Sequence, residues 1–138
     1  MDTGHWLLAE GLNIDEKTFG FIYLITNLTN NKKYIGKKQC ISKIKRRPLK
    51  GKKNKRIDYK ESDWKDYTSS SNELNADIIK LGKQNFKFEI IKACGSKWEL
   101  AYEEAKEQMN REVLLKDDYY NGILNLRIGR PPKSLLIK

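Results

Sequence analysis

The sequence predicts a small α+β domain whose three-stranded antiparallel sheet is flanked by helices. Three observations support this class: an apolar and aromatic hairpin near the start, a later strand of alternating residues, and two segments that open with helix-capping residues. A chain of 138 residues suits one compact domain. We expect an N-terminal arm over residues 1–18, the domain over 19–128 and a C-terminal tail over 129–138.

The first two strands are expected to pair as a hairpin. Residues 19–26 are apolar, aromatic and β-branched, and residues 33–36 resume this composition. Residues 27–31, between them, contain three asparagines, which tolerate positive φ and hydrogen-bond their own backbone. In the arm before the hairpin, Trp6-Leu7-Leu8 has two candidate docking surfaces, the domain itself or a second copy of the chain. A homodimer is therefore left open.

Residues 37–60 form the polar, basic centre of the chain. Ten Lys and Arg residues lie between positions 43 and 60, and Pro48 and Gly51 break any helix there. A run of like charges is usually a solvated loop. Because this run directly follows the hairpin, we expect a loop inserted in the domain, around residues 38–60, that contacts phosphates and becomes ordered on DNA.

A first helix and a third strand follow the basic centre. Ser70 and Glu73 have the spacing of a capping box and predict a helix that ends at Leu81. Gly82 supplies the C-terminal stop. Residues 86–92 begin by alternating apolar and charged side chains, which predicts a strand with one face in water.

The longest helix is expected over about residues 97–115, after a second capping box at Ser96 and Glu99. Its core stripe is predicted to consist of Trp98, Ala101, Tyr102, Ala105, Met109 and Val113. A second row along its flank contains Leu100, Glu104, Gln108 and Leu115. A carboxylate on this flank would be partly screened from water and rigidly held, which suits a metal ligand.

The charge balance indicates a polyanionic partner. The chain has 28 Lys and Arg against 18 Asp and Glu, a net charge of +10, and nucleic acid is the leading candidate. No apolar run approaches the roughly 20 residues of a spanning helix, so no membrane partner is expected. Residues 1–11 do not resemble a signal peptide, which favours a cytoplasmic location, that of the host cell if the chain is phage-encoded.

The cysteines and the histidine do not predict a zinc site. Cys40 and Cys94 have no metal-ligand spacing, and His5 is the only histidine in the sequence. In a chain without an export signal, two reduced thiols are favoured over a disulfide, although the disulfide is not excluded.

Two short motifs lie on the expected hairpin, Gly20-Phe21-Ile22-Tyr23 and Tyr34-Ile35-Gly36. With them the chain resembles the GIY-YIG nuclease family, over roughly residues 19–126. The first motif is one residue longer than the family's triplet, and the second is unaltered. The resemblance implies a GIY-YIG-like fold, hydrolysis of phosphodiester bonds in double-stranded DNA, and one divalent metal, Mg²⁺ or Mn²⁺.

The resemblance also implies how the tyrosines act. It gives the role of general base to Tyr23 or Tyr34, and we assign it to Tyr23, with Tyr34 orienting water or phosphate. A tyrosine ordinarily titrates near about 10. The neighbouring Lys37 and Lys38 are expected to favour its phenolate. Lys37 can also assist either proton transfer or leaving-group stabilisation.

The family's metal ligand is a single glutamate on the long helix. Glu104 lies on the flank row and fits this placement best, with Glu103 as the second candidate. The family also has a phosphate-binding arginine after the second motif, where this chain has Ile44. The nearby candidates are Arg46, Arg47 and Arg56, and we assign the role to Arg56 because it leads into the next folded segment and is better positioned than an arginine in mid-loop. Arginine rather than lysine suits the role because it can bind phosphate through two parallel hydrogen bonds.

The remaining expected DNA contacts lie mostly in the basic centre of the chain. They are Lys38, Arg46, Arg47, Lys50, Lys52, Lys53, Lys55 and, near the end of the domain, Asn121. Asn121 resembles an asparagine that follows a tyrosine in the family. Its alternative role is that of a simple turn residue.

The leading interpretation is a metal-dependent DNA endonuclease of the phage or mobile-element type. The first alternative is a non-catalytic DNA-binding module of the same fold, in which the tyrosines only pack. The absence of an arginine at the family position supports this alternative. A ribosome-associated or RNA-processing protein is the third interpretation, and it rests on charge alone.

Overall fold

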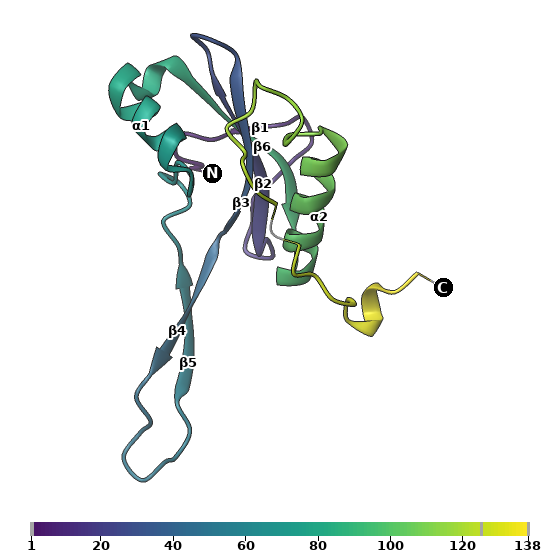
Figure 1. The fold of residues 1–138 in the computed structure, drawn as a ribbon. Coiled ribbons are helices and arrows are strands. Elements are labelled where there is room, and N and C mark those ends of the chain that lie inside the picture. Colours follow the sequence, from purple (N-terminus) through teal and green to yellow (C-terminus); the bar gives the residue numbers. More distant parts are fainter. Residues whose placement is uncertain (1, 125, 138) are drawn as a thin grey trace.

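The structure is a computed structural model that describes residues 2–124 and 126–137, and its centre is a four-stranded sheet with a helix on each face (Figure 1). In spatial order the strands are β1 (Leu7–Leu8), β6 (Phe86–Cys94), β2 (Gly20–Asn27) and β3 (Lys32–Gln39). The helices are α1 (Asn72–Leu81) and α2 (Lys97–Asn110), and the short 3₁₀ turns are η1 (Lys83–Asn85) and η2 (Lys133–Leu135). A separate hairpin consists of β4 (Ile41–Arg46) and β5 (Arg56–Glu61).

The α+β class is confirmed, but the expectation of three antiparallel strands is wrong. Strand β2 is antiparallel to both β3 and β6, as expected. The fourth strand, β1, runs parallel to β6 and pairs Leu7 with Glu89 and Leu8 with Ile90. A strand of two residues is too short to produce an alternating pattern, so β1 could not be predicted from the sequence.

Strand β2 supplies residues to two cores, one on each face of the sheet. Phe21 and Ile25 pack in the core that includes Leu74 of α1. Ile22 lies on the opposite face and packs in a second core with Leu100 of α2. Helix α1 covers one face of the sheet and helix α2 covers the other, and β3 forms the edge between them. The pocket described below opens at this edge.

The N-terminal segment packs on the domain, which is one of the two surfaces left open for Trp6, Leu7 and Leu8. Trp6 is only 2% exposed, and its indole nitrogen donates a hydrogen bond of 2.6 Å to the carbonyl of Trp64. Ile14 is also part of the same core. The segment before β2 therefore contributes to the fold and to the environment of the residues after β5.

His5 lies beside this segment in an environment that favours the neutral ring. Its ring stacks on Phe88 with centroids 4.0 Å apart, and its Nε2 lies 2.9 Å from the carbonyl oxygen of Tyr67. Its Nδ1 is buried without a hydrogen-bond partner among the described residues. Burial, assisted by the positive charge of Lys83, lowers the pKa of His5 to about 4.

Acid is therefore expected to weaken the fold through His5. Its ordinary pKa is 6.5, so between pH 6.5 and about 4 the unfolded chain binds a proton that the folded chain does not. The stabilisation is present above pH 6.5 and is lost as the pH falls toward 4. We expect His5→Gln to flatten this part of the curve of unfolding free energy against pH, measured by urea denaturation. Parallel curves for the two proteins would contradict this assignment.

Both helices begin at serine caps. The capping residue of α1 is Ser71 and not Ser70, since the Ser71 hydroxyl accepts a 3.2 Å hydrogen bond from the Leu74 N–H. Ser96 caps α2 as expected, accepting from the Glu99 N–H at 3.2 Å. Gly82 ends α1 with a φ of 91°, a backbone conformation that residues other than glycine rarely adopt.

Helix α2 is shorter than expected and presents a different face to the sheet. Tyr102 and Met109, expected in the core, are 43% and 50% exposed, whereas Leu100 and Gln108 are 1% and 5% exposed. Two residues of the flank row are thus buried, and so are Ala105 and Val113 of the expected core stripe, whereas Leu115 of the flank row is 80% exposed. The reason lies in β2, because a Cβ at Gly20 would lie 2.7 Å from Leu100 Cδ2. The missing side chain admits Leu100, and helical periodicity cannot reveal such a fit.

The basic centre of the chain forms the β4–β5 hairpin, which projects from the domain as an arm (Figure 1). The register pairs Arg46 with Arg56 near the far end. At the base, the Ser62 N–H donates to the Cys40 carbonyl at 2.9 Å. A loop was expected here, because lysine-rich strands exposed on both faces lack the apolar alternation that identifies a strand.

Cys40 and Cys94 are free thiols, and both are buried. In the part of the chain that the structure describes, no helix has both the length and the apolar character needed to cross a bilayer.

Candidate active site

A polar pocket opens at the outer edge of β3, between the loop before α1 and helix α2. It is lined by Tyr23, Tyr34, Lys37, Tyr67, Ser70, Glu104, Gln108 and Ile123. Four of the five residues expected to be catalytic are in this lining: Tyr23, Tyr34, Lys37 and Glu104. The structure thus brings together side chains from two strands and a helix that lie far apart in sequence.

The strand register places both tyrosines on the same face of the hairpin. Tyr34 lies directly opposite Ile25, and directly paired residues share a face. Tyr23, which lies opposite Gly36, is two residues before Ile25 on the same strand and therefore lies on that face as well. The two ring centroids are 6.1 Å apart. A side chain at Gly36 would overlap the hydroxyl of Tyr23, so this glycine lets the Tyr23 ring extend across β3. The second motif therefore has a steric role in building the pocket.

Side chains close the outer edge of β3 in place of another strand. The Ile35 N–H donates to Asn121 Oδ1 at 3.0 Å, and the Ile35 carbonyl accepts from Asn121 Nδ2 at 2.8 Å. Gln108 Nε2 donates to the same carbonyl at 3.0 Å. Two residues farther along, the Glu104 carboxylate accepts a hydrogen bond from the backbone of Lys37. Glu104 is thus held against the strand that carries Tyr34.

The expectation that Asn121 contacts DNA is wrong in this structure. Asn121 is 8% exposed, and both ends of its side-chain amide are bonded to Ile35. Its role here is to fix the edge strand beside the pocket. The sequence could not separate the two roles, since an asparagine after a tyrosine suits either a turn or a contact.

Glu104 is the pocket's carboxylate. Its side chain is 14% exposed, and its Oε1 lies 4.0 Å from Lys37 Nζ. Burial raises the pKa of Glu104, and the charge and backbone N–H of Lys37 act in the opposite direction. Glu103, the second candidate, pairs instead with Lys92 at 2.7 Å and does not line the pocket.

The phenol groups are more strongly protonated than the sequence suggested. Burial raises the pKa of Tyr23 well above its ordinary value, and the neighbouring Tyr34 and Tyr67 raise it further. Lysines beside the second motif were expected to lower it. Lys38 instead pairs with Asp63 at 2.7 Å, and its Nζ lies 4.1 Å from the Tyr67 ring centroid. In the free protein, the expectation of a favoured phenolate is therefore wrong.

Arg56 lies outside the pocket, which corrects its expected role at the cleaved phosphate. It stands at the start of β5, and its Nε donates to the carbonyl of Arg47 at 3.2 Å. Arg46 pairs with Asp58 on the same hairpin. The reason is the hairpin itself, which carries these arginines away from the domain. Among the described residues, no arginine lines the pocket.

Tyr67, Ser70 and Gln108 also line the pocket. The Tyr67 and Tyr23 hydroxyls are hydrogen-bonded to each other, and Ser70 Oγ lies 3.4 Å from Tyr34 Oη. Gln108 had been assigned no role, but it could have been found from its spacing, because it lies one helical turn after Glu104 on the same face. Tyr67 and Ser70 follow the basic centre of the chain in sequence, and their position there suggested contacts to the DNA backbone near the site.

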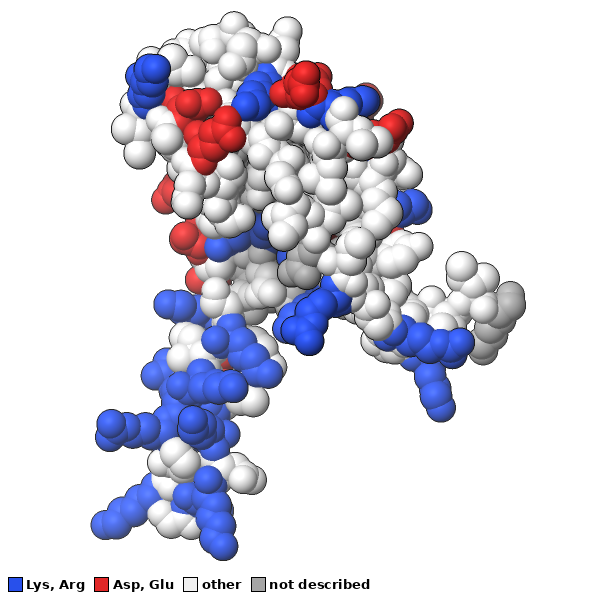
Figure 2. All heavy atoms as spheres, viewed as in Figure 1, with Lys and Arg blue, Asp and Glu red and all other residues white. Residues whose placement is uncertain are grey.

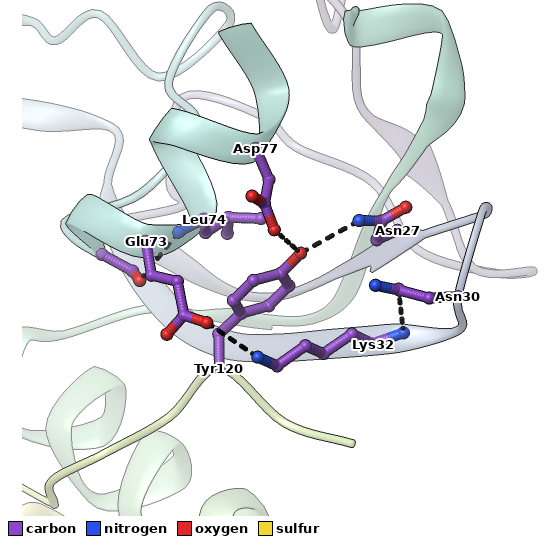
Figure 3. Close-up of polar contacts among 8 residues, drawn as sticks. Asn27, Asn30, Lys32, Glu73, Leu74, Asp77 and Tyr120 are labelled. Carbon is purple, nitrogen blue, oxygen red and sulfur yellow. Dashed lines mark hydrogen bonds and ion pairs between the residues drawn. The ribbon is translucent and has the colours of Figure 1, made fainter. Parts of the chain in front are cut away.

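A buried polar network at Tyr120 fixes the segment that closes the β3 edge (Figure 3). The Tyr120 hydroxyl donates to Asp77 Oδ2 at 2.6 Å and accepts from Asn27 Nδ2 at 3.0 Å. Lys32 Nζ lies 4.5 Å from the Tyr120 ring centroid and pairs with Glu73 at 2.8 Å. The network thus joins α1, the turn after β2 and the C-terminal part of the domain.

Tyr120→Phe is expected to lower the unfolding free energy by about 1–3 kcal/mol, because it removes two hydrogen bonds and leaves the fully buried Asn27 amide without this partner. Urea denaturation measures the change. Tyr102→Phe serves as the matched control, since Tyr102 is 43% exposed on α2. Equal stabilities for the two variants would show that the network contributes little.

Two tyrosines on adjacent strands, a lysine beside them and a glutamate from the long helix define a GIY-YIG domain. The family model described as "Putative endonuclease segE, GIY-YIG domain" matches residues 6–124. The chain belongs to this family of nuclease domains. No curated protein and no solved structure gives a significant match. The matched range begins at Trp6, so it includes the short strand β1.

Proposed function

We propose that the protein is a metal-dependent DNA endonuclease that hydrolyses phosphodiester bonds and is of the phage or mobile-element type. The observation that carries the proposal is the convergence of Tyr23, Tyr34, Lys37 and Glu104 on one pocket. Membership of the segE GIY-YIG family supports nuclease activity. The small size and basic insertion, which resemble those of small phage-encoded members, support the phage type, and such an enzyme would act in the cytoplasm of the host cell.

Glu104 is the residue that would hold the metal ion. Mg²⁺ prefers oxygen ligands and often takes one or two carboxylates, with waters and substrate phosphate completing its shell. Burial disfavours the charged form of the Glu104 carboxylate, and a nearby cation would stabilise that charged form. Among the described residues, no three His, Cys, Asp or Glu side chains gather at one point, which favours such an open shell. Bound Mg²⁺ or Mn²⁺ would supply a Lewis acid for the phosphate oxygens.

The chain's own groups divide the remaining tasks. In its phenolate form, Tyr23 acts as the general base that takes a proton from the attacking water, and Tyr34, near Ser70, orients the water or the phosphate. Burial and the negative charge of Glu104 disfavour this phenolate in the free protein, and a cation held by Glu104 would lower the pKa of Tyr23 by offsetting that charge. Lys37 offsets negative charge on the phosphate. Its side chain is 38% exposed and only 4.0 Å separates it from Glu104, so its ammonium group can reach substrate without leaving the pocket.

A plasmid assay tests the proposal. Supercoiled plasmid is incubated with the protein in Mg²⁺, in Mn²⁺ and in EDTA, and nicked or linear DNA is expected only with metal. The product also distinguishes nicking from double-strand cleavage. Intact plasmid in every metal condition, with a protein shown to be folded by circular dichroism, would contradict the proposal.

A non-catalytic DNA-binding module is the second candidate function. It is favoured by one observation, that no arginine lines the pocket among the described residues. Such a module would shift DNA in a gel with strong salt dependence and yield no cleaved product.

A further inference from the structure

Most of the excess positive charge of the protein lies on the β4–β5 arm, which we define as residues 41–61. This segment contains ten Lys and Arg against two Asp and Glu, and the rest of the chain has eighteen against sixteen. The arm therefore carries a net charge of +8 out of +10. Figure 2 shows basic side chains along the whole arm, while basic and acidic groups are interspersed on the domain.

Ile41 packs against the domain core at the base of the arm, but beyond this base the arm has no core of its own and no cover from the domain. Every residue from 45 to 61 is exposed, including three large apolar side chains, Leu49 at 52%, Ile57 at 47% and Tyr59 at 68%. An isolated two-stranded hairpin is only marginally stable in water. A long hairpin of this kind buries little apolar area within the protein, so its exposed groups are available to a partner.

One face of the arm combines ammonium groups with apolar ones. Lys43 lies opposite Tyr59 and Lys45 lies opposite Ile57, so these four side chains share a face. Lysines contact phosphates, and apolar groups contact base edges such as the thymine methyl.

The dimensions of the arm fit duplex DNA. The major groove is about 12 Å wide and admits a two-stranded β-ribbon. At about 3.3 Å per residue, the six residues of β4 span roughly 20 Å. The turn region, residues 47–55, has five Lys and Arg and no acidic residue. The paired strands alone can thus follow a groove for more than half a helical turn of DNA, and the basic turn region extends beyond them.

The arm is also connected directly to the pocket at both of its ends. Lys37 precedes it on β3, and Tyr67 and Ser70 follow it before α1, and all three line the pocket. A hydrogen bond between Ser62 and Cys40 closes its base. A duplex held by the arm is therefore anchored beside the tyrosines and Glu104.

From these observations we infer that the β4–β5 arm binds in the major groove of double-stranded DNA and holds the duplex beside the pocket. The inference rests on the proposed function for the choice of DNA as partner. The inference extends that function, because it assigns the binding of double-stranded DNA to a part of the chain that is separate from the cleavage site.

Fluorescence anisotropy with a labelled duplex of about 30 base pairs, in EDTA and over a range of KCl concentrations, tests the inference. The tip variant replaces Lys50, Lys52, Lys53 and Lys55 with serine. Each lost phosphate contact lowers the slope of log Kd against log salt by about 0.9, so the loss of four contacts is expected to lower the slope by about 3.6 and to weaken the affinity at least roughly tenfold. The control variant replaces four other exposed lysines, Lys17, Lys80, Lys106 and Lys116, with serine and is expected to keep the wild-type slope.

Groove occupancy is tested with dyes of known preference. The wild-type protein is expected to displace methyl green from the major groove and to leave netropsin in the minor groove. Tyr59→Ser is expected to weaken methyl green displacement without changing the salt slope. Displacement of netropsin alone, equal affinity for single-stranded DNA, or a wild-type slope in the tip variant would each overturn the inference.

The two proposals fail in distinguishable ways. A protein that binds duplex DNA through the arm but never cuts it refutes the endonuclease proposal and leaves the arm as a DNA-binding element. A protein that cuts DNA while the tip variant binds like the wild type refutes the arm inference alone.

Discussion

Glu104→Gln is expected to lower DNA cleavage by at least about 100-fold, because the neutral amide no longer attracts the cation that stabilises charge on the phosphate. The substitution keeps the size of the side chain, and its amide oxygen can still accept the hydrogen bond from the Lys37 backbone. The fold and the salt-sensitive binding of duplex DNA are therefore expected to persist. Initial rates of plasmid nicking and anisotropy with labelled duplex measure the two properties.

Glu103→Gln is the matched control for this experiment. It removes the same charge from the adjacent position of α2, from a side chain that is 21% exposed and pairs with Lys92 outside the pocket. We expect near-wild-type cleavage. Equal losses in both variants would show that the net charge of the helix matters, and full activity in Glu104→Gln would remove Glu104 from the metal site.

The second large effect is expected for the paired tyrosines. Tyr23→Phe keeps the buried ring and removes only the hydroxyl, and loss of a general base typically costs about 10²- to 10⁴-fold in rate. Tyr34→Phe is expected to cost less, because an orienting hydroxyl can be partly replaced by water. Single-turnover rates with excess enzyme separate this loss from any change in DNA affinity.

Tyr102→Phe, which changes an exposed phenol on the outer side of α2, is expected to leave the rate unchanged. If Tyr34→Phe lost more activity than Tyr23→Phe, the assignment of the base would pass to Tyr34. If neither variant lost activity, the tyrosines would serve only packing, and other groups would have to perform the chemistry.

The two tyrosines and Glu104 could be predicted as one site from the sequence, because regular strands and helices leave few ways to arrange these residues relative to one another. In an antiparallel hairpin the alternation of side chains has a period of two residues, so the spacing of Tyr23 and Tyr34 determines whether they share a face. The flank position of Glu104 on a helix packed against that hairpin then limits where its carboxylate can lie. These residues meet in the structure as the pattern predicted.

The remaining parts depend on tertiary contacts that leave little trace in a single sequence. The position of Arg56 depends on the length and regularity of the arm, which lysine-rich strands do not reveal. The pairing of Asn121 depends on an unpaired strand edge at Ile35. The burial of Leu100 depends on its fit against Gly20. In each case the deciding partner lies far away in the chain.

The closed edge of β3 also limits how two copies of the protein could associate. Along this edge, Lys33 bonds to the backbone of Asp118 and Tyr120, Ile35 bonds to Asn121, and Lys37 bonds to Glu104. A second chain adding its own strand here would have to break these bonds and displace the carboxylate assigned to the metal. Continuation of the sheet across the β3 edge would therefore disable the pocket, so an active dimer must use a different surface.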